Sequence, residues 1–215
     1  MIRTKRSYSI ILVLAALILA SCATTTATVD IEALFNRGFE FAGKGDYDRA
    51  IADFTAVLRI KPDHYEALYN RGFSYHNKGD LNRAIVDYTA ALRIKPDDYQ
   101  ALNNRGLALA EKGDYDGAIA DYTAALRIKP DHYEALVNRG FIFGEKGDYD
   151  GAIADYTAAL RIEPDDTEVL FNRGCAYGEK GDFNRAIADW EAVLRIDPND
   201  ADARRNIERA RQERR

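Results

Sequence analysis

The sequence predicts an all-α protein, a right-handed α-solenoid of five helix-turn-helix repeats, each about 34 residues long, closed by a C-terminal capping helix. Three observations lead to this prediction. All five prolines recur at one constant interval, from Pro62 to Pro198. A glycine recurs at the same interval from Gly38 to Gly174, and so does a Gly-Asp pair that begins at Gly45. The apolar residues between these markers follow helical spacing, and a period of this length is typical of stacked helix pairs.

Residues 1–21 are expected to be a signal peptide, outside the folded domain. Three basic residues precede an unbroken apolar run, residues 10–20, which is too short to span a bilayer. The run ends in Leu19-Ala20-Ser21-Cys22, which resembles the lipobox of bacterial lipoproteins. In that family the signal is removed before the cysteine, which becomes acylated. The alternatives are an ordinary signal peptide or an uncleaved anchor.

The lipoprotein resemblance has consequences for location and for cysteine chemistry. It implies that residues 22–30 form a lipidated N-terminus and linker, held on a membrane of the cell envelope by acyl chains on Cys22. Ala23 after the cysteine favours the outer membrane over the inner one. Cys175 is the only other cysteine, so we expect it to be a small apolar residue without a disulfide partner.

The repeats are placed at residues 31–64, 65–98, 99–132, 133–166 and 167–200. Each is expected to be two antiparallel helices, separated by the Gly-Asp pair, with the proline ending the second helix. Asp97, Asp131 and Asp165 are predicted N-caps, because an acid or amide follows each of them at the spacing of a capping box. Residues 201–215 contain six arginines and few apolar residues. They are predicted to form a basic capping helix with a polar outer face.

The repeat resembles a known family. The tetratricopeptide repeat follows the pattern W-x2-L-G-x2-Y, then A-x3-F, then P. The second repeat here reads Leu68-x2-Arg71-Gly72-x2-Tyr75, Ala84-x3-Tyr88 and Pro96. The match extends over five consecutive copies in residues 31–200. The chain departs from the pattern by placing Leu at the Trp position and Arg at the Leu position.

The unexpected arginine has a matching acid. One Asp recurs in each second helix with the period of the Arg, so that Asp53 precedes Arg71 and Asp87 follows it at similar separations along the chain. We predict a structural ladder of bidentate Arg–Asp pairs, formed within or between repeats. The alternative is that each Arg extends to solvent. The ladder would consist of Arg37, Arg71, Arg105, Arg139, Arg173, Asp53, Asp87, Asp121, Asp155 and Asp189.

Composition excludes several function classes. The formal charge of −5 combines +3 in residues 1–21, +3 in residues 201–215 and −11 in residues 22–200. A nucleic-acid-binding protein would need a basic face, so nucleic acid is not an expected partner. We find no group of residues with the spacing of a metal site and no nucleophile with a base, and we therefore expect no enzyme, no metal and no cofactor.

The tetratricopeptide resemblance implies a binding surface. In that family the first helices line a concave groove that holds extended or helical peptides. Carried over by position, the groove would have an acidic edge of Glu111, Glu145 and Glu179. The basic clamp by which some members hold carboxylate tails is not recognisable here. The alternative is that the aromatic residues only pack against adjacent helices. The predicted groove residues are Phe35, Phe39, Tyr69, Phe73, His76, Asn103, Leu107, Val137, Phe141, Phe171 and Cys175.

The sequence thus predicts a lipid-anchored scaffold that binds another protein. Its partner would offer a basic-flanked amphipathic or extended segment, because the body of the chain is acidic. The rival interpretation is a carrier that holds an apolar small ligand in the same groove.

Replacement of Cys22 tests the predicted anchor. The Cys22→Ser variant should lack acyl mass and accumulate as a precursor or as a soluble product, because serine offers no thiol for lipidation. Fractionation and mass spectrometry of the mature N-terminus measure both effects. Normal membrane retention of the wild type without any acyl mass would contradict the prediction.

Overall fold

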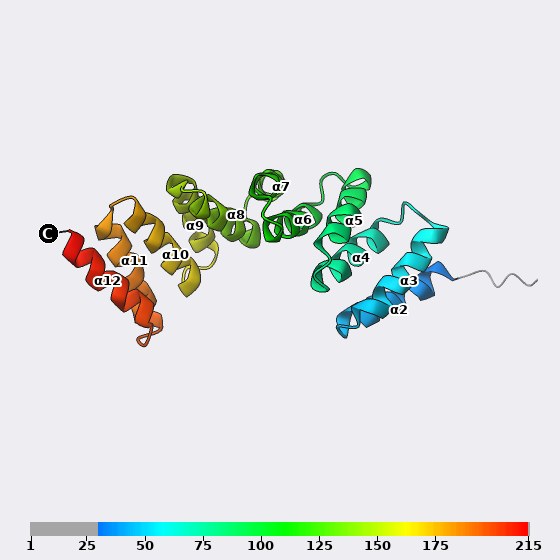
Figure 1. The fold of residues 1–215 in the computed structure, drawn as a ribbon, viewed down its shortest axis with the longest axis horizontal. Helices are drawn as coiled ribbons and strands as arrows, with labels where there is room; N and C mark the ends of the chain where they lie inside the picture. Colours follow the sequence, from blue (N-terminus) through cyan, green and yellow to red (C-terminus); the bar gives the residue numbers. More distant parts are fainter. Residues whose placement is uncertain (1–29, 215) are drawn as a thin grey trace, which may run out of the picture.

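The computed structural model describes residues 30–214, and every regular element in that range is a helix (Figure 1). The helices form antiparallel pairs, one pair in each repeat, followed by a single last helix. Residues 1–29, and with them the predicted signal peptide and Cys22, lie outside the described part. None of the helices in the described range is both long enough and apolar enough to cross a membrane. The helices are α2 (Ile31–Gly43), α3 (Tyr47–Ile60), α4 (Tyr65–Asn77), α5 (Leu81–Ile94), α6 (Tyr99–Glu111), α7 (Tyr115–Ile128), α8 (Tyr133–Glu145), α9 (Tyr149–Ile162), α10 (Thr167–Glu179), α11 (Phe183–Ile196) and α12 (Ala201–Glu213).

The turns within and between repeats follow from local residues. Within the third repeat, Gly113 has a φ of 83°, a left-handed conformation that glycine adopts without steric cost. The next residue, Asp114, caps α7 by accepting a hydrogen bond from the Gly117 amide at 3.0 Å. The predicted N-caps of the first helices were wrong by one residue.

The observed N-caps are Asp98, His132 and Asp166, one residue after the predicted Asp97, Asp131 and Asp165. The predicted residues lie instead in the turn that follows each proline. The Asp98 carboxylate accepts from the Ala101 amide at 2.9 Å. The Asp-x-x-acid pattern therefore marked the loop correctly and the start of the helix incorrectly.

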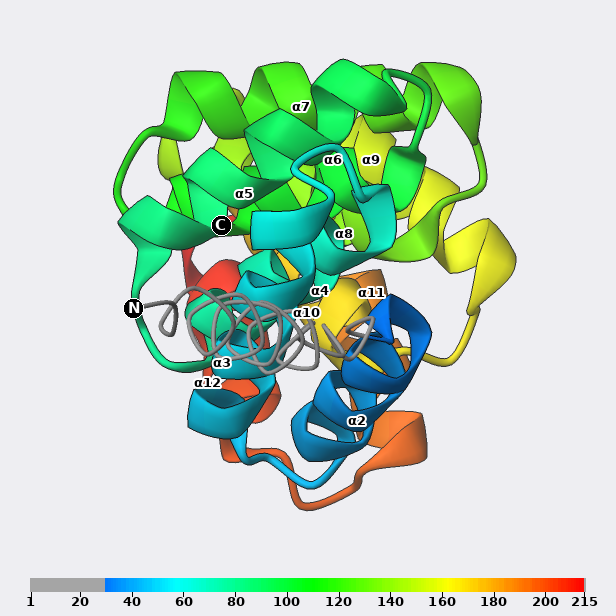
Figure 2. The ribbon, with the colours of Figure 1, turned by 90° about the vertical axis from the view of Figure 1, so that its right-hand side faces the viewer.

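The helix pairs stack into an arch (Figures 1 and 2). Successive first helices (α2, α4, α6, α8 and α10) contact one another, whereas successive second helices in the described range make no comparable contact. The first helices therefore line the inner, more tightly curved side of the arch. Within a repeat the two helices approach closely at a glycine: a Cβ on Gly174 would lie 2.6 Å from the Trp190 indole nitrogen.

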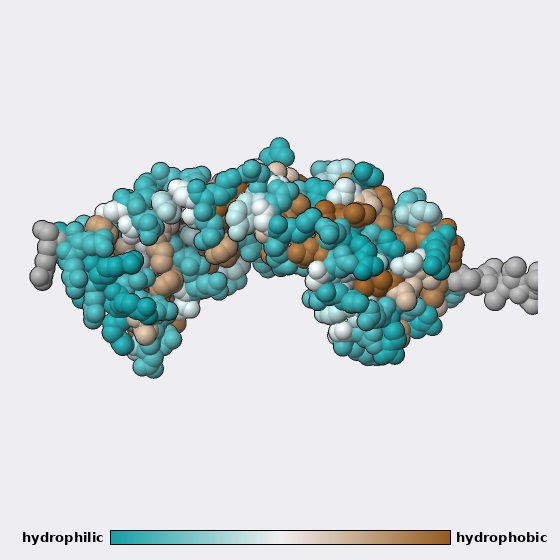
Figure 3. All heavy atoms as spheres, viewed as in Figure 1, coloured by the Kyte–Doolittle hydropathy of each residue, from teal (hydrophilic) through white to brown (hydrophobic). Residues whose placement is uncertain are grey.

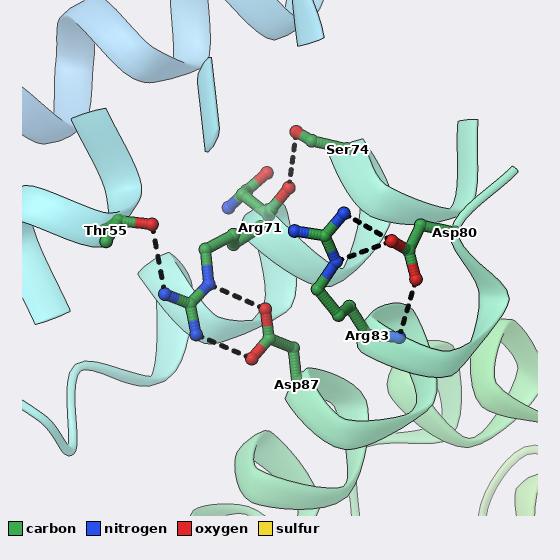
Figure 4. Close-up of polar contacts among 7 residues, drawn as sticks. Thr55, Arg71, Ser74, Asp80, Arg83 and Asp87 are labelled. Atoms are coloured by element: carbon green, nitrogen blue, oxygen red, sulfur yellow. Dashed lines mark hydrogen bonds and ion pairs between the residues drawn. The ribbon is translucent and has the colours of Figure 1, made fainter. Parts of the chain in front are cut away.

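Arg–Asp pairs join the two helices of every repeat. In each pair the Arg Nε and one terminal nitrogen donate to the two carboxylate oxygens of the Asp in the second helix of the same repeat, at 2.6–2.8 Å. Figure 4 shows this arrangement for Arg71 and Asp87. The five Asp residues are buried. Of the two pairings that the sequence left open, the structure has the one within the repeat.

The same arginines also connect neighbouring repeats. The second terminal nitrogen of Arg71 donates to the Thr55 hydroxyl of the preceding repeat at 3.1 Å (Figure 4). The equivalent bonds of Arg105, Arg139 and Arg173 to Thr89, Thr123 and Thr157 measure 2.9–3.2 Å. Each of these four guanidinium groups therefore joins three helices. In Arg71, Arg105 and Arg173 the hydrogen bonds to the Asp raise the pKa of the guanidinium, whereas burial lowers it by less.

Truncation of one ladder arginine tests its contribution to stability. Arg105→Leu should lower the free energy of unfolding by about 3 kcal/mol, because it leaves the buried Asp121 carboxylate without its partner. The double variant Arg105→Leu/Asp121→Leu should lose less, since no charge is stranded. Urea unfolding followed by circular dichroism measures both.

Arg37→Leu is the matched control. The Arg37 side chain is 59% exposed and that of Arg105 is 23% exposed, so water can replace Arg37 and its loss should cost only about 1 kcal/mol. Equal losses for the two single variants would contradict this account.

Candidate functional site

A row of apolar side chains follows the inner face of the arch. Its members occur once in each first helix, at the same position of every repeat. Phe39 is 59% exposed, Phe73 39% and Phe141 52%. Other large apolar residues are exposed too, but these three are the exposed aromatic side chains among the described residues, and all three lie in one row. We call the row of Phe39, Phe73, Leu107, Phe141 and Cys175 the inner row.

The other predicted groove residues mostly pack between helices. Phe35 lies 5.7 Å from Phe54 between ring centroids, Tyr69 lies 5.9 Å from Tyr88, and Phe171 lies 6.5 Å from Trp190. The third and fourth repeats have Asn103 and Val137 at the same position. Asn103 is buried, and Val137 is half-buried against the core. The packing role that the sequence left as an alternative therefore describes this set, and the inner row differs from it in exposure.

Carboxylates flank the inner row at the ends of the first helices. His76 Nε2 lies 3.0 Å from Glu111 Oε1, so this acid has a partner on the neighbouring first helix. Glu145 and Glu179, the equivalents of Glu111 in the next two repeats, are exposed. Among residues 30–214 neither of them forms an ion pair. The predicted acidic edge thus has one paired and two unpaired members.

Two hollows open near the C-terminal end of the arch. One, of about 270 Å³, lies between α8 and α10 and is bordered by Phe141, Glu145, Tyr156, Cys175 and Glu179. We call it the α8–α10 hollow. The other, of about 400 Å³, lies between α10 and α12 and is bordered by Trp190 and Arg209, among others. Neither hollow was foreseen from the sequence.

Two features bear on metal binding and on thiol chemistry in the described residues. Within residues 30–214, no three His, Cys, Asp or Glu side chains gather so as to hold a metal ion. Cys175 is free and half-buried, and burial raises the pKa of its thiol. A thiol with a raised pKa is a poor nucleophile at neutral pH.

Sequence reasoning missed the links between repeats. The Thr partners of the ladder arginines were not identified, although Thr recurs with the same period as the Arg. A second set of links joins the residue after each first helix to the preceding repeat, as in Lys112 Nζ to Asn82 Oδ1 at 2.6 Å. Lys78–Asp48, Lys146–Asp116 and Lys180–Asp150 are equivalent ion pairs. The polar residues of these links recur at the interval of the repeat, so a search for every recurring polar residue could have found them.

Comparison with known proteins identifies the repeat. Models of the tetratricopeptide repeat match residues 35–99, 74–133 and 103–167, and a further model of the same repeat matches residues 167–200. A search of curated proteins found no match.

Solved structures share the fold. A crystal structure of MamA is 24% identical, with a TM-score of 0.74, over 80% of this chain and 94% of that chain. A tetratricopeptide repeat protein from Parabacteroides merdae ATCC 43184 is 24% identical, with a TM-score of 0.74, over 85% and 73%. YrrB, described as a TPR protein with an unusual peptide-binding site, is 20% identical, with a TM-score of 0.73, over 81% and 90%.

Truncation of aromatic residues should separate the inner row from the packed set. Phe171→Ala should lower the free energy of unfolding by about 2 kcal/mol, because it opens a cavity beside Trp190. Phe141→Ala should change it by less than about 1 kcal/mol, since half of that ring already lies in water. Thermal unfolding measures the difference. A larger loss for Phe141→Ala than for Phe171→Ala would show that the inner row is structural.

Proposed function

Because the chain belongs to the tetratricopeptide repeat family, we propose that it is a lipid-anchored scaffold of the cell envelope that binds another protein on the inner face of its arch. A fold of this kind presents extended surfaces for interaction. YrrB, whose structure is described as having an unusual peptide-binding site, supports peptide binding as a use of the same architecture.

The observation that carries this proposal is the exposure of Phe39, Phe73 and Phe141 along one face. Aromatic residues at interface centres dominate binding energies, at roughly 2 kcal/mol or more for the strongest. Figure 3, which views the arch from the side, shows hydrophobic residues over its middle and N-terminal parts and a largely hydrophilic C-terminal end. A partner segment with several apolar side chains on one side would match the three exposed phenylalanines of the inner row.

The negative charge of the chain favours partner segments with positive charge. Residues 22–200 have a net charge of −11, and Glu145 and Glu179 flank the inner row without ion pairs to other described residues. A partner segment with basic flanks would therefore be attracted, and its association would weaken as salt screens the charges. The segment can be extended or an amphipathic helix, since either presents apolar side chains on one side.

The membrane anchor rests on Cys22 and its preceding apolar run. Acyl chains at this position would hold the arch close to a membrane through a short linker, residues 22–30. Ala23 favours the outer membrane. The scaffold would then concentrate its partner at the envelope surface without spanning the bilayer.

A carrier of apolar small molecules fits the inner face less well. The two hollows are open and are bordered by charged residues such as Glu179 and Arg209. Sites for such molecules are concave, mostly apolar and about 300–1,000 Å³ in volume. The α8–α10 hollow, at about 270 Å³, is below this range and suits a single side chain.

A crosslinking pull-down from intact envelopes tests the proposed face. Full-length wild type should capture a partner, and Phe73→Ala and Phe141→Ala should each reduce the capture by about tenfold or more, since they remove central apolar anchors. Higher salt should weaken it further. Circular dichroism verifies folding.

Two variants on the second helices serve as controls. Val86→Ala removes an exposed apolar residue from α5, and Arg127→Ala removes an exposed charge from α7. Both should retain the partner. If the inner-row variants stay folded and keep every partner while the controls lose them, binding occurs on the outer face and the proposal is wrong.

A further inference from the structure

The α8–α10 hollow combines aromatic walls with unpaired carboxylates. Phe141, Tyr149 and Tyr156 supply the aromatic walls, and Glu145 and Glu179 supply the carboxylates. The border includes no Lys, Arg or His among the described residues. The border of the hollow therefore has a net negative charge. It also includes three aromatic rings.

Three residues that border the hollow are smaller than their counterparts in another repeat. Cys175 and Ala176 in α10 stand where the preceding repeat has Phe141 and Ile142. Gly144 in α8 stands where α4 has His76, and a Cβ built on Gly144 would meet no atom within 4 Å. Smaller residues at these positions on both helices leave the space open.

Tyr156 forms the buried wall of this hollow. It is 3% exposed, and its hydroxyl has no hydrogen-bond partner among residues 30–214. The equivalent hydroxyls of Tyr88 and Tyr122 are completely enclosed, whereas the Tyr156 side chain borders open space. Burial raises the pKa of Tyr156, so the phenol is neutral near pH 7. A neutral phenol can accept a hydrogen bond from a donor that enters the hollow.

The neighbouring first-helix sites lack this combination. Glu111, the equivalent acid one repeat earlier, already has His76 at 3.0 Å. The hollow between α10 and α12 is bordered by Glu179 and Glu213 but also by Arg209, whose positive charge opposes the entry of a cation. Of the two hollows, the α8–α10 hollow is thus the one whose border has carboxylates and no basic side chain.

We propose that the α8–α10 hollow is a specificity subsite that takes one cationic side chain, a lysine or an arginine, of the segment bound by the inner row. This inference rests on the proposed function, because the inner row supplies the apolar part of the binding. The cation would stack on the aromatic walls and donate hydrogen bonds to Glu145, Glu179 and the Tyr156 hydroxyl.

Such a subsite would set register and direction of the bound segment. The inner row repeats with the period of the helix pairs, and similar apolar side chains could enter it in more than one register. A single cationic position near one end removes this ambiguity, because a shifted segment would place an apolar group among carboxylates or leave its cation unpaired.

Selection from a random peptide library displayed on phage tests the subsite. Peptides enriched on the full-length chain in detergent should share several apolar residues and one Lys or Arg at a constant distance from them. Replacement of that residue by norleucine in a synthetic copy should weaken binding by about tenfold. Selection on Glu145→Gln/Glu179→Gln should keep the apolar residues and lose the cationic position.

Two further variants keep the test decisive. Glu111→Gln, the matched control, should select the same peptides as the wild type. Cys175→Phe places in α10 the residue that α8 has at this position; it should close the hollow and abolish the cationic preference without a change in charge. Circular dichroism verifies folding.

The outcomes separate this inference from the proposed function. Apolar peptides without a shared cationic position on the wild type, or a cationic preference that survives in Glu145→Gln/Glu179→Gln, would overturn the subsite and leave the inner row intact. Peptides that bind equally well to Phe73→Ala and Phe141→Ala would overturn the inner row itself, and with it the subsite.

Discussion

The stack depends on a guanidinium that contacts three helices. Each ladder Arg forms two bonds to an Asp in its own repeat, and from the second repeat onward a third bond to a Thr in the preceding repeat. A buried Arg–Asp pair adds little net stability, because desolvation offsets most of the attraction. Its geometry is nevertheless restrictive, since a bidentate pair tolerates little rotation. We therefore attribute to the ladder the register between helices and between repeats, while apolar burial supplies most of the stability.

The ends of the arch are modified where the ladder stops. Glu191 replaces Thr in the last repeat and pairs with Arg211 of α12 at 2.9 Å, and Ile207 stands where a further Arg would lie. At the other end, exposed Glu40 occupies the position at which Ser74 is buried one repeat later. Both ends are thus adapted to water. Inside the stack, by contrast, the Arg and Asp of each repeat satisfy each other's charges.

Period predicted the fold well and the site only in part. The prolines and glycines set the helix pairs, because only a few residues end a helix or make a left-handed turn. The N-caps of α6, α8 and α10 were misplaced by one residue. In α6, for example, Asp97 and Asp98 are both good caps, and only the geometry of the preceding turn distinguishes them. Arg71 and Asp87 were identified as partners by their period, but spacing could not choose between pairing within and between repeats.

The groove residues show why exposure is harder to predict than helical position. Phe73 and Tyr69 both lie on the inner side of α4, yet Tyr69 packs on Tyr88 and Phe73 remains in water. The difference depends on how far neighbouring first helices separate, which a pattern along one helix does not contain. The hollow beside Tyr156 depends on small residues in two helices, Gly144 and Cys175, and is visible only when both are placed in space.

The central claim is that the inner face of the arch, whose helices the ladder holds in register, is the face that binds the partner protein. Site-specific photocrosslinking in intact cells tests it most directly, with p-benzoylphenylalanine placed at Phe73 and Phe141 on the inner face and at Val86 and Arg127 on the second helices. The account predicts that the two inner positions crosslink to one segment of the same partner and that the two outer positions do not. Adducts of the partner with Val86 and Arg127 alone would contradict it.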